Sequence, residues 1–495
     1  MVVKIDLLAA QLFGNEAAED EEEDVFWSNL MKRDDLADFD SHANTIKVVS
    51  AYKGEGKSSL LRALGSTMSR RDDCLVVKTT GSDASPDIAS PDSAKWAKAW
   101  RKGLFNLIAA EVGATIGVAW NDDSMALVEE AEKQGFRRRS IVSAIVDRIT
   151  PSLNFANGAA GVSVKPSKLG VVDSEGVLKR FRADNVKLIW LVIDDVDRNY
   201  RDTKQDRARI AGFFDAIRDM ANSVPQLRVR TSIRPNVYAS IRREFESFSH
   251  VRQYIVKISW TEVQMRRMLA QRIEGYLHRT AQLHMLNLSE SGSRRDADLI
   301  KVVFDTPVKW GRADGTRSIH IPLYTLSAHR PRWVIELCKV SAAKAASRSS
   351  GRISLDHINA EMAEFGENRI SDIVAEFKPQ CPQLDELIDA FYGGRDLYTT
   401  MELEKHIEEK IIAKFLPNIA GMTGAPRAMD IASFLFEVGI FFGRRDLEGG
   451  GYEHISFAQR PGLLRSRIGS DDDLRWEIHP VFRQALRINQ ISQTS

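Results

Sequence analysis

The stretch TIKVVSAYKGEGKSS, residues 45–59, decides the fold of this 495-residue chain. Thr45 to Ser50 is a short, β-branched apolar run of the kind that forms a buried strand. Glycines at positions 54 and 56 follow it, and leucines then recur at helical spacing from Leu60 onward. The succession of strand, glycine-containing loop and helix predicts an α/β domain that begins near this stretch.

The loop between this strand and helix has the composition of a phosphate-binding loop. Two glycines let the backbone turn tightly, so that successive N–H groups converge on a phosphate at the positive end of the following helix. Lys57 is expected to reach the β- and γ-phosphates of ATP, and the Ser58 hydroxyl to bind Mg²⁺. Ala51 replaces the usual first glycine, which is tolerable if its φ stays negative. The predicted nucleotide-binding residues here are Ala51, Lys53, Gly54, Glu55, Gly56, Lys57, Ser58 and Ser59.

A second motif, LIWLVIDDVDR at 188–198, ends a continuous apolar run with carboxylates. Carboxylates that close a buried strand are costly unless a cation uses their charge. Asp194 is therefore predicted to hold Mg²⁺ through water, and Asp195 to act as general base toward the attacking water. Asp197 is a weaker candidate for either role. The alternative is that these carboxylates only cap a strand and a turn.

Further strands are predicted at 75–79, 227–233 and 254–258, with helical patterns between them. This alternation indicates a P-loop NTPase-type α/β fold, a parallel sheet with crossover helices. The acidic run at 19–24 is expected to be a solvated tail, and 151–176 a loop. The expected parts of the chain are an N-terminal segment at 1–40, an α/β ATPase domain at 41–260 with a helical insertion at about 92–150, a helical lid at 261–375, and a winged-helix-like C-terminal module at 376–495.

Two further segments resemble a known group of ATPases. LRVRTSIRPNVY at 227–238 resembles the sensor-1 strand of the prokaryotic STAND and KAP-type P-loop ATPases, and the DDVDR at 194–198 is similar to the KAP-type signature. The resemblance implies that Arg234 senses the γ-phosphate. HRPRWVIEL at 329–337 resembles the sensor-2 region of AAA-type lids, which implies that Arg332 or Arg330 faces the nucleotide from the lid. The alternative for each arginine is an ordinary surface position.

The resemblance extends in layout to both ends of the chain. FGNEAAEDE at 13–21 and IHPVFRQAL at 478–486 resemble segments of bacterial P-loop ATPases found among defence genes. This resemblance implies a homo-oligomeric ATPase switch in antiphage defence, acting with an effector protein from a neighbouring gene. An arginine finger, if this chain supplies one, is assigned to Arg198 or Arg243.

Charge and cysteine content exclude several other classes. The formal net charge is +1, from 69 basic and 68 acidic residues, so contact with nucleic acid needs a local patch. Cys74, Cys338 and Cys381 are too few for a disulfide framework or a four-ligand zinc site. No basic leader and no apolar run of about 18 residues is found, so no membrane contact and a cytoplasmic location are expected.

Two other functions stay open at this point. The first is a DNA-binding initiator or loader that uses ATP for assembly, and the second is a scaffold that binds ATP without turnover. His329 and His479 are interpreted as structural residues rather than metal ligands. DNA contact would fall to arginines around the turn, or wing, of the predicted C-terminal hairpin, namely Arg444, Arg445, Arg460, Arg465 and Arg467.

Overall fold

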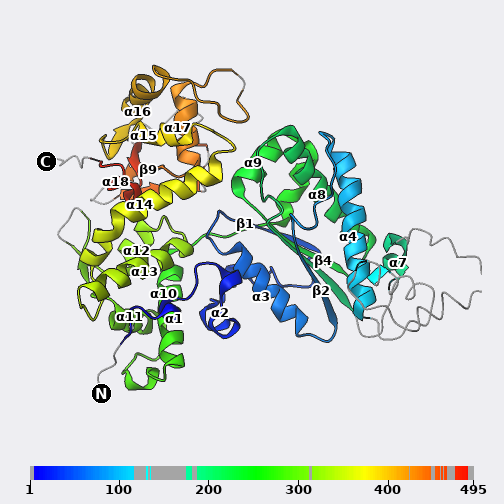
Figure 1. The fold of residues 1–495 in the computed structure, drawn as a ribbon, viewed down its shortest axis with the longest axis horizontal. Helices are drawn as coiled ribbons and strands as arrows, with labels where there is room; N and C mark the ends of the chain where they lie inside the picture. The colour runs from blue at the N-terminus through cyan, green and yellow to red at the C-terminus, as the bar shows by residue number, and fades with distance from the viewer. Residues whose placement is uncertain are drawn as a thin grey trace, which may run out of the picture.

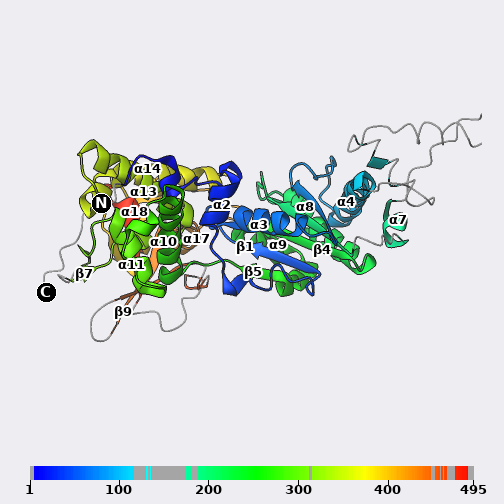
Figure 2. The ribbon, with the colours of Figure 1, turned by 90° about the horizontal axis from the view of Figure 1, so that it is seen from below.

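The computed structural model describes most of the chain in a few long pieces. These are residues 5–115, 174–180, 187–311, 315–422, 424–447, 452–457 and 474–488, with a few single positions and short pieces between them. An α/β part and a helical part with its C-terminal module lie side by side along the long axis (Figures 1 and 2). None of the helices in these pieces combines the length and apolar character of a membrane span.

A five-stranded parallel sheet forms the centre of the α/β part (Figure 1). Its order is β2-β3-β4-β1-β5, so β4 lies between the strand that enters the glycine loop and the strand that ends in carboxylates. The five predicted strands are confirmed to within one residue at each end. The strands are β1 (Ile46–Ser50), β2 (Cys74–Thr80), β3 (Leu188–Asp194), β4 (Leu227–Ile233) and β5 (Ile255–Lys257).

Helices cover both faces of this sheet, which explains why β3 is apolar at nearly every position. Successive side chains of a strand point to opposite faces. Ile189, Leu191 and Ile193 accordingly pack in one core, while Trp190 and Val192 pack in another. The helices of this part are α3 (Lys57–Ser69), α4 (Ser93–Thr115), α7 (Ser174–Arg180), α8 (Lys204–Ser223) and α9 (Pro235–Glu244), with a 3₁₀ segment at Glu246–Tyr254.

The prediction of a loop at 151–176 is wrong at its end, because α7 begins at Ser174. The rest of that segment, and most of the predicted insertion beyond Thr115, lie outside the described residues. Within the described part of the insertion, α4 packs along α8 through Trp96 and Trp100, both of which are buried. These tryptophans are packing residues of the α/β core.

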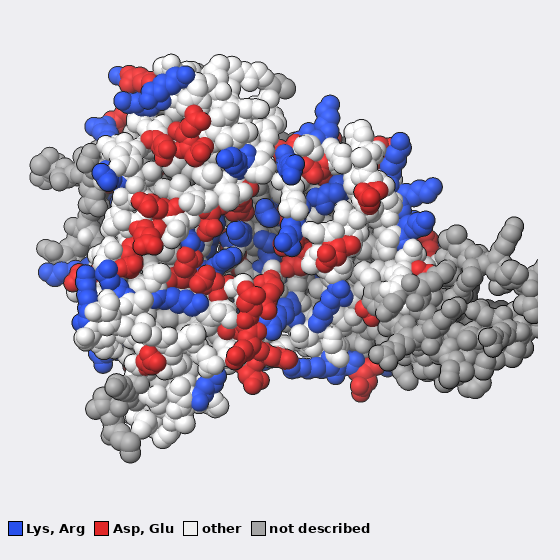
Figure 3. Space-filling view, viewed as in Figure 1, with Lys and Arg blue, Asp and Glu red and all other residues white. Residues whose placement is uncertain are grey.

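The N-terminal segment is folded onto the molecule, so the acidic run at 19–24 is not a tail, although most of its side chains are exposed as predicted. It contains α1 (Ala10–Phe13) and α2 (Glu23–Asn29), with 3₁₀ turns at Ala18–Asp20 and Asp34–Leu36. The Glu21 carboxylate accepts the Asn15 N–H and lies 3.9 Å from Arg272 of the helical part. Arg62 of α3 donates to Glu21 O at 3.1 Å. This segment therefore bridges the two parts, and its exposed acidic side chains gather over α2 in Figure 3.

The helical part and the C-terminal module share one continuous hydrophobic core. The core is large, and it also takes in Leu12 and Phe13 of the N-terminal segment and Tyr52 of the glycine loop. The elements of the helical part are α10 (Glu262–Arg279), a 3₁₀ turn at Leu283–Met285, α11 (Gly292–Val303), the strand pair β6 (Val308–Lys309) and β7 (Thr316–Arg317), α12 (His320–Leu326), α13 (Pro331–Ser347) and α14 (Leu355–Phe377).

The C-terminal module has the connectivity of a winged helix. Along the chain, one helix is followed by a short strand, two helices and three more strands, the first two of which form a hairpin. The four strands form one sheet in the order β10-β9-β11-β8, and all neighbours are antiparallel. The second helix after the first strand, α17, has the position that the recognition helix has in helix-turn-helix proteins. The elements are α15 (Leu384–Asp389), β8 (Leu397–Thr399), α16 (Thr400–Ile407) with a π turn at Glu408–Ile412, α17 (Ala428–Glu437), β9 (Phe441–Asp446), β10 (Tyr452–Ile455), β11 (Leu474–Ile478) and α18 (Pro480–Arg483).

Candidate nucleotide-binding site

The loop between β1 and α3, here called the P-loop (residues 51–56), wraps the side chain of Lys57. Gly54 has φ 83° and Gly56 has φ 100°, conformations in which other residues are strained. Lys57 Nζ donates to Ala51 O at 2.7 Å and to Tyr52 O at 3.2 Å. Ala51 is not among the described residues with positive φ, so alanine is compatible with this position. The P-loop therefore keeps its wrapped form without the usual first glycine.

The acidic pair lies at the same edge of the sheet. Asp194 closes β3, and the Ser232 hydroxyl of β4 donates to its Oδ1 at 2.6 Å. The Asp195 N–H donates to Asp194 Oδ1 at 2.8 Å and to Ser232 Oγ at 3.1 Å. Ser232 pairs with Val49 in the β1–β4 register, one residue before β1 ends and the P-loop begins. Ser232 thus fixes both aspartates next to the P-loop.

The electrostatics of this edge favour a cation. Burial raises the pKa of Asp195, and the carboxylates of Asp194 and Asp197 raise it further. Lys57 has the opposite effect, which places its ammonium within electrostatic range of Asp195. Carboxylates and the Ser58 hydroxyl are hard oxygen donors, and Mg²⁺ ordinarily binds one or two carboxylates together with nucleotide phosphates. The donor set therefore fits Mg²⁺.

Arg234 and Asp197 are engaged with each other. The Arg234 N–H donates to Asp197 Oδ2 at 2.7 Å, and Arg234 Nε lies 3.8 Å from the same oxygen. Asp197 is completely buried and anchors the first turn of α9. Asp197 Oδ2 thus serves the fold, whereas its Oδ1 is buried and has no hydrogen-bond partner among the described residues, so Asp197 stays the weaker candidate beside Asp194 and Asp195. Arg234 is within electrostatic range of Asp195, where it lowers the pKa of that group.

The first turn of α13 contacts the P-loop directly. The Arg332 N–H donates to Gly54 O at 3.2 Å, and a Cβ at position 54 would lie 3.0 Å from Arg332 Cβ. The Arg330 guanidinium lies 5.7 Å from the Tyr52 ring centre and 4.4 Å from that of Trp333. Both lid arginines that the resemblance singles out therefore lie beside the P-loop, although they are some 280 residues away in sequence.

Three residues that hold this site together are not among its predicted residues. Trp260 Nε1 donates to Glu55 O at 2.9 Å, and Tyr324 OH donates to Trp260 O at 2.9 Å. The third is Ser232, which ties the acidic pair together. Ser232 lies two residues before Arg234, and its hydroxyl beside that of Thr231 near the end of β4 is the signal that marks it. No comparable signal marks Trp260 or Tyr324, because their partners are distant in sequence.

The remaining predicted site residues differ in placement. Lys53 is exposed at the tip of the P-loop, and the Glu55 carboxylate turns back to accept the Tyr52 N–H at 2.6 Å. Ser58 and Ser59 lie in the first turn of α3 and are partly exposed. Two arginines are candidate arginine fingers. Arg198 is exposed, and the side chain of Arg243 lies outside the described part.

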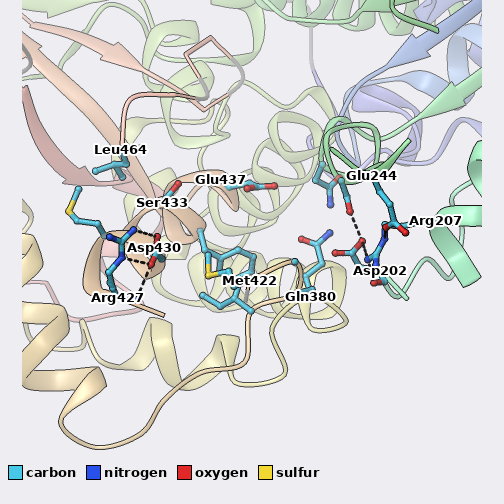
Figure 4. A pocket seen from close by; sticks show the side chains of 17 residues that line it. Asp202, Arg207, Glu244, Gln380, Met422, Arg427, Asp430, Ser433, Glu437 and Leu464 are labelled. Carbon is cyan, nitrogen blue, oxygen red and sulfur yellow. Dashed lines mark hydrogen bonds and ion pairs between the residues drawn. The ribbon is translucent and has the colours of Figure 1, made fainter. Parts of the chain in front are cut away.

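A cavity of about 850 Å³ lies between α9 and α17 (Figure 4). On the α/β side, Arg207 pairs with Asp202 at 3.0 Å and also with Glu244. On the other side, Arg427 Nε lies 3.1 Å from Asp430 Oδ2. The residues that line the cavity include none from the P-loop. The cavity is therefore separate from the candidate nucleotide site.

Of the arginines predicted to contact DNA, Arg444 is engaged within the fold. Arg444 is buried, pairs with Asp446 at 2.8 Å and lies 3.5 Å from Glu477, so its assignment to nucleic acid is wrong. Its charge serves the fold of the C-terminal module. Arg445 is half-buried and Arg460 is exposed. Arg465 and Arg467 lie outside the described residues.

No protein family and no curated protein matches the chain. Among solved structures, the ORC2 protein of Aeropyrum pernix with ADPNP and ADP is 11% identical, with 91% of this chain and 89% of that chain covered and a TM-score of 0.39. Cdc6p of Pyrobaculum aerophilum is also 11% identical, with 98% and 99% covered and a TM-score of 0.30. Drosophila ORC bound to DNA is 13% identical, with 90% and 82% covered and a TM-score of 0.28. Likeness this low says nothing about individual site residues.

Proposed function

We propose that this chain binds ATP with Mg²⁺ at the P-loop and hydrolyses it, as a nucleotide-driven switch. The observation that carries the proposal is the wrapping of the P-loop around Lys57, with Gly54 and Gly56 at positive φ and the ammonium on two loop carbonyls. A loop of this form at a helix N-terminus directs its N–H groups at a phosphate. The acidic pair at the same edge of the sheet supplies the second half of the proposed ATPase site.

Each group has one task in the proposed reaction. Lys57 binds the β- and γ-phosphate oxygens, and Asp195 accepts a proton from the attacking water. Ser58 and Asp194 are the residues that would hold Mg²⁺, whose charge neutralises the phosphates when it is bound. The proposed γ-phosphate contacts are Arg234 from the end of β4 and Arg332 from the lid, since guanidinium groups suit spread phosphate charge.

The test is ATP turnover by the purified full-length chain and by Lys57→Ala, with Mg²⁺ and with EDTA. We expect turnover in the wild type that needs Mg²⁺ and falls by about 100-fold or more in the variant, the size of effect that loss of a transition-state contact produces. Lys339→Ala is a matched control, because Lys339 is a partly buried lysine that contacts Glu16 away from the P-loop. Equal turnover in Lys57→Ala and wild type would contradict the proposal.

The biological setting proposed from the resemblance is antiphage defence, with a homo-oligomer that acts on an effector from a neighbouring gene. Mass determination with and without ATP tests the oligomer. Co-expression with neighbouring genes and phage challenge tests the setting. A chain that stays monomeric at every nucleotide and protein concentration would contradict the oligomeric switch.

The second candidate is a DNA-binding initiator or loader, favoured by the winged-helix connectivity of the C-terminal module. In the present arrangement, however, Asp430 and Glu437 of α17 line the cavity opposite α9. DNA binding by α17 would therefore require the module to turn away from the α/β part. A mobility-shift titration across salt decides this candidate, because phosphate contacts give a steep decline of affinity with salt.

A further inference from the structure

Two consecutive residues between α12 and α13 adopt a strained backbone. Ala328 has φ 49° and His329 has φ 63°, the left-handed region that side chains other than glycine rarely adopt. Strain of this kind persists only where the surroundings over-determine the conformation, and it gathers at functional sites. The residue that follows is Arg330, and two residues further on Arg332 contacts the P-loop. The strained pair therefore sets the position of both lid arginines.

The His329 ring is held between the helical part and the C-terminal module. It stacks on Tyr324, with ring centres 4.0 Å apart and planes 9° apart, and lies 6.4 Å from the ring centre of Phe442. Phe442 belongs to β9 and lies 4.7 Å from the ring of His479, which is buried. Burial, and to a smaller degree His454, lower the pKa of His329 to about 4, so the ring is neutral at pH 7.

Two routes of contact lead from His329 to the P-loop. One follows the chain, since Arg332 N–H donates to Gly54 O at 3.2 Å. The other passes through the stacked ring of Tyr324, whose hydroxyl donates to Trp260 O, while Trp260 Nε1 donates to Glu55 O, both at 2.9 Å. The two routes end on adjacent P-loop carbonyls.

We propose that His329 is a positioning residue that couples the C-terminal module to the nucleotide site. Its ring, clamped by Tyr324 and Phe442, keeps the strained turn in place, and the turn keeps the first turn of α13 on the P-loop. Displacement of β9 loosens the P-loop, and ordering of the P-loop by phosphate tightens the clamp, because coupling between two sites is reciprocal. The inference rests on the proposed function for its nucleotide readout, but the contacts themselves do not depend on it.

The test compares two substitutions in the clamp with one outside it. His329→Asn removes the stacked ring while keeping a residue that tolerates positive φ. Phe442→Leu alters the partner ring from the C-terminal module and changes nothing in the lid. His406→Asn is the matched control, because His406 also stacks on an aromatic ring, that of Phe391 at 4.6 Å, but lies within the C-terminal module.

Two readouts are measured on the full chain: hydrogen exchange of the peptide that spans 51–60 without nucleotide, and the Kd of a fluorescent ATP analogue. We expect both clamp variants to exchange the P-loop amides faster and to bind the analogue about five- to tenfold more weakly, the lower range of allosteric couplings. His406→Asn should leave the exchange rate and the Kd within twofold of the wild type, even where it lowers the melting temperature as much as the clamp variants do.

The outcomes separate the two proposals. Faster P-loop exchange in the clamp variants, in a protein that does not bind the analogue, upholds the coupling and overturns the proposed function. Exchange and Kd unchanged in Phe442→Leu, or changed equally in His406→Asn, overturn the coupling. Should His329→Asn not fold, Phe442→Leu alone decides.

Discussion

Two clusters of charged side chains in this molecule differ in how their charge is balanced. The first is the acidic pair after β3, where burial and like charge raise the pKa of Asp195. The second surrounds Glu477 on β11, which contacts Arg444, His454 and Arg483. Burial alone would raise the pKa of Glu477, but His454, Arg483 and Arg444 together lower it to about 2.

The difference shows in which cluster the protein itself balances the charge. At Glu477 the protein itself supplies the cations, so the charges are balanced within the fold. At Asp194 and Asp195 the described protein groups leave an excess of negative charge that a bound cation can neutralise. Buried charge that is paired is a structural feature, whereas a carboxylate with a raised pKa marks a candidate functional site.

The largest effect is expected for Asp195→Asn. Asparagine is isosteric and tolerates the φ of 52° at this position, but it cannot accept a proton from water. Turnover of ATP should fall by about 10²- to 10⁴-fold, the usual contribution of a general base, while nucleotide affinity stays within a few-fold. Steady-state turnover and equilibrium binding of an ATP analogue measure the two quantities.

Asp202→Asn is the matched control, because Asp202 has a similar φ of 57° but is bonded to Arg207 and Ser240. It should hydrolyse ATP at close to the wild-type rate. Normal turnover in Asp195→Asn would instead agree with a scaffold that binds nucleotide without using this carboxylate.

Glu477→Gln should act on stability rather than chemistry. Removing the negative charge leaves Arg444, Arg483 and His454 without their common partner, and breaking a buried ion pair costs about 3–5 kcal/mol in the free energy of unfolding. Urea unfolding at pH 7 gives this value. Arg395→Gln, which removes an exposed partner of Glu402, should cost less than about 1 kcal/mol. A loss for Glu477→Gln as small as that of the control would show that the network is not structural.

The free energy of unfolding should fall over two successive pH ranges as the solution is made more acidic. The folded-state pKa values of His329 and His479 are lowered by burial, with His454 contributing to both. A buried neutral histidine resists the proton that the same histidine accepts in the unfolded chain. Its contribution to the free energy of unfolding is therefore fully present above pH 6.5 and falls toward pH 4, by up to about 1.4 kcal/mol per pH unit for each histidine. The contribution of Glu477 is lost only below about pH 4.5, toward pH 2.

Unfolding midpoints measured from pH 8 to pH 3 test this order. Arg330 and Arg483 also act on this histidine cluster, so the wild-type curve is compared with that of His329→Asn. The variant should show a shallower slope between pH 6.5 and pH 4 and the same loss at lower pH. Identical slopes above pH 4 would mean that His329 does not resist protonation in the folded state.

The phosphate side of the site could be predicted from local sequence, and the lid side could not be derived in the same way. The P-loop and the acidic strand end are recognised from residues that are neighbours in the chain. The signals are a buried strand, two glycines, and carboxylates at the end of an apolar run, where their charge is costly without a cation. Parallel strands then bring both motifs to one sheet edge, so their proximity follows from the fold class.

The rest depends on contacts that sequence spacing does not encode. Arg444 looked like a surface arginine in a hairpin, but its partner Glu477 comes from another strand. The acidic run at 19–24 looked like a solvated tail, but Arg62 and Arg272 from two different parts hold it. Such pairings form between segments far apart in sequence, and only the three-dimensional arrangement distinguishes a paired charge from a free one.

The smallest expected effect bears most directly on the comparison of the two clusters. Without nucleotide or Mg²⁺, Asp195→Asn should raise the free energy of unfolding, because a carboxylate with a raised pKa destabilises the folded state at any pH above that pKa. Urea unfolding at pH 7 in EDTA measures this gain. Mg²⁺ with ATP should stabilise the wild type through binding to the folded state, and should stabilise Lys57→Ala much less. A loss of stability in Asp195→Asn, of the same sign as in Glu477→Gln, would place the acidic pair with the paired, structural charges and remove the physical reason for a cation at this edge of the sheet.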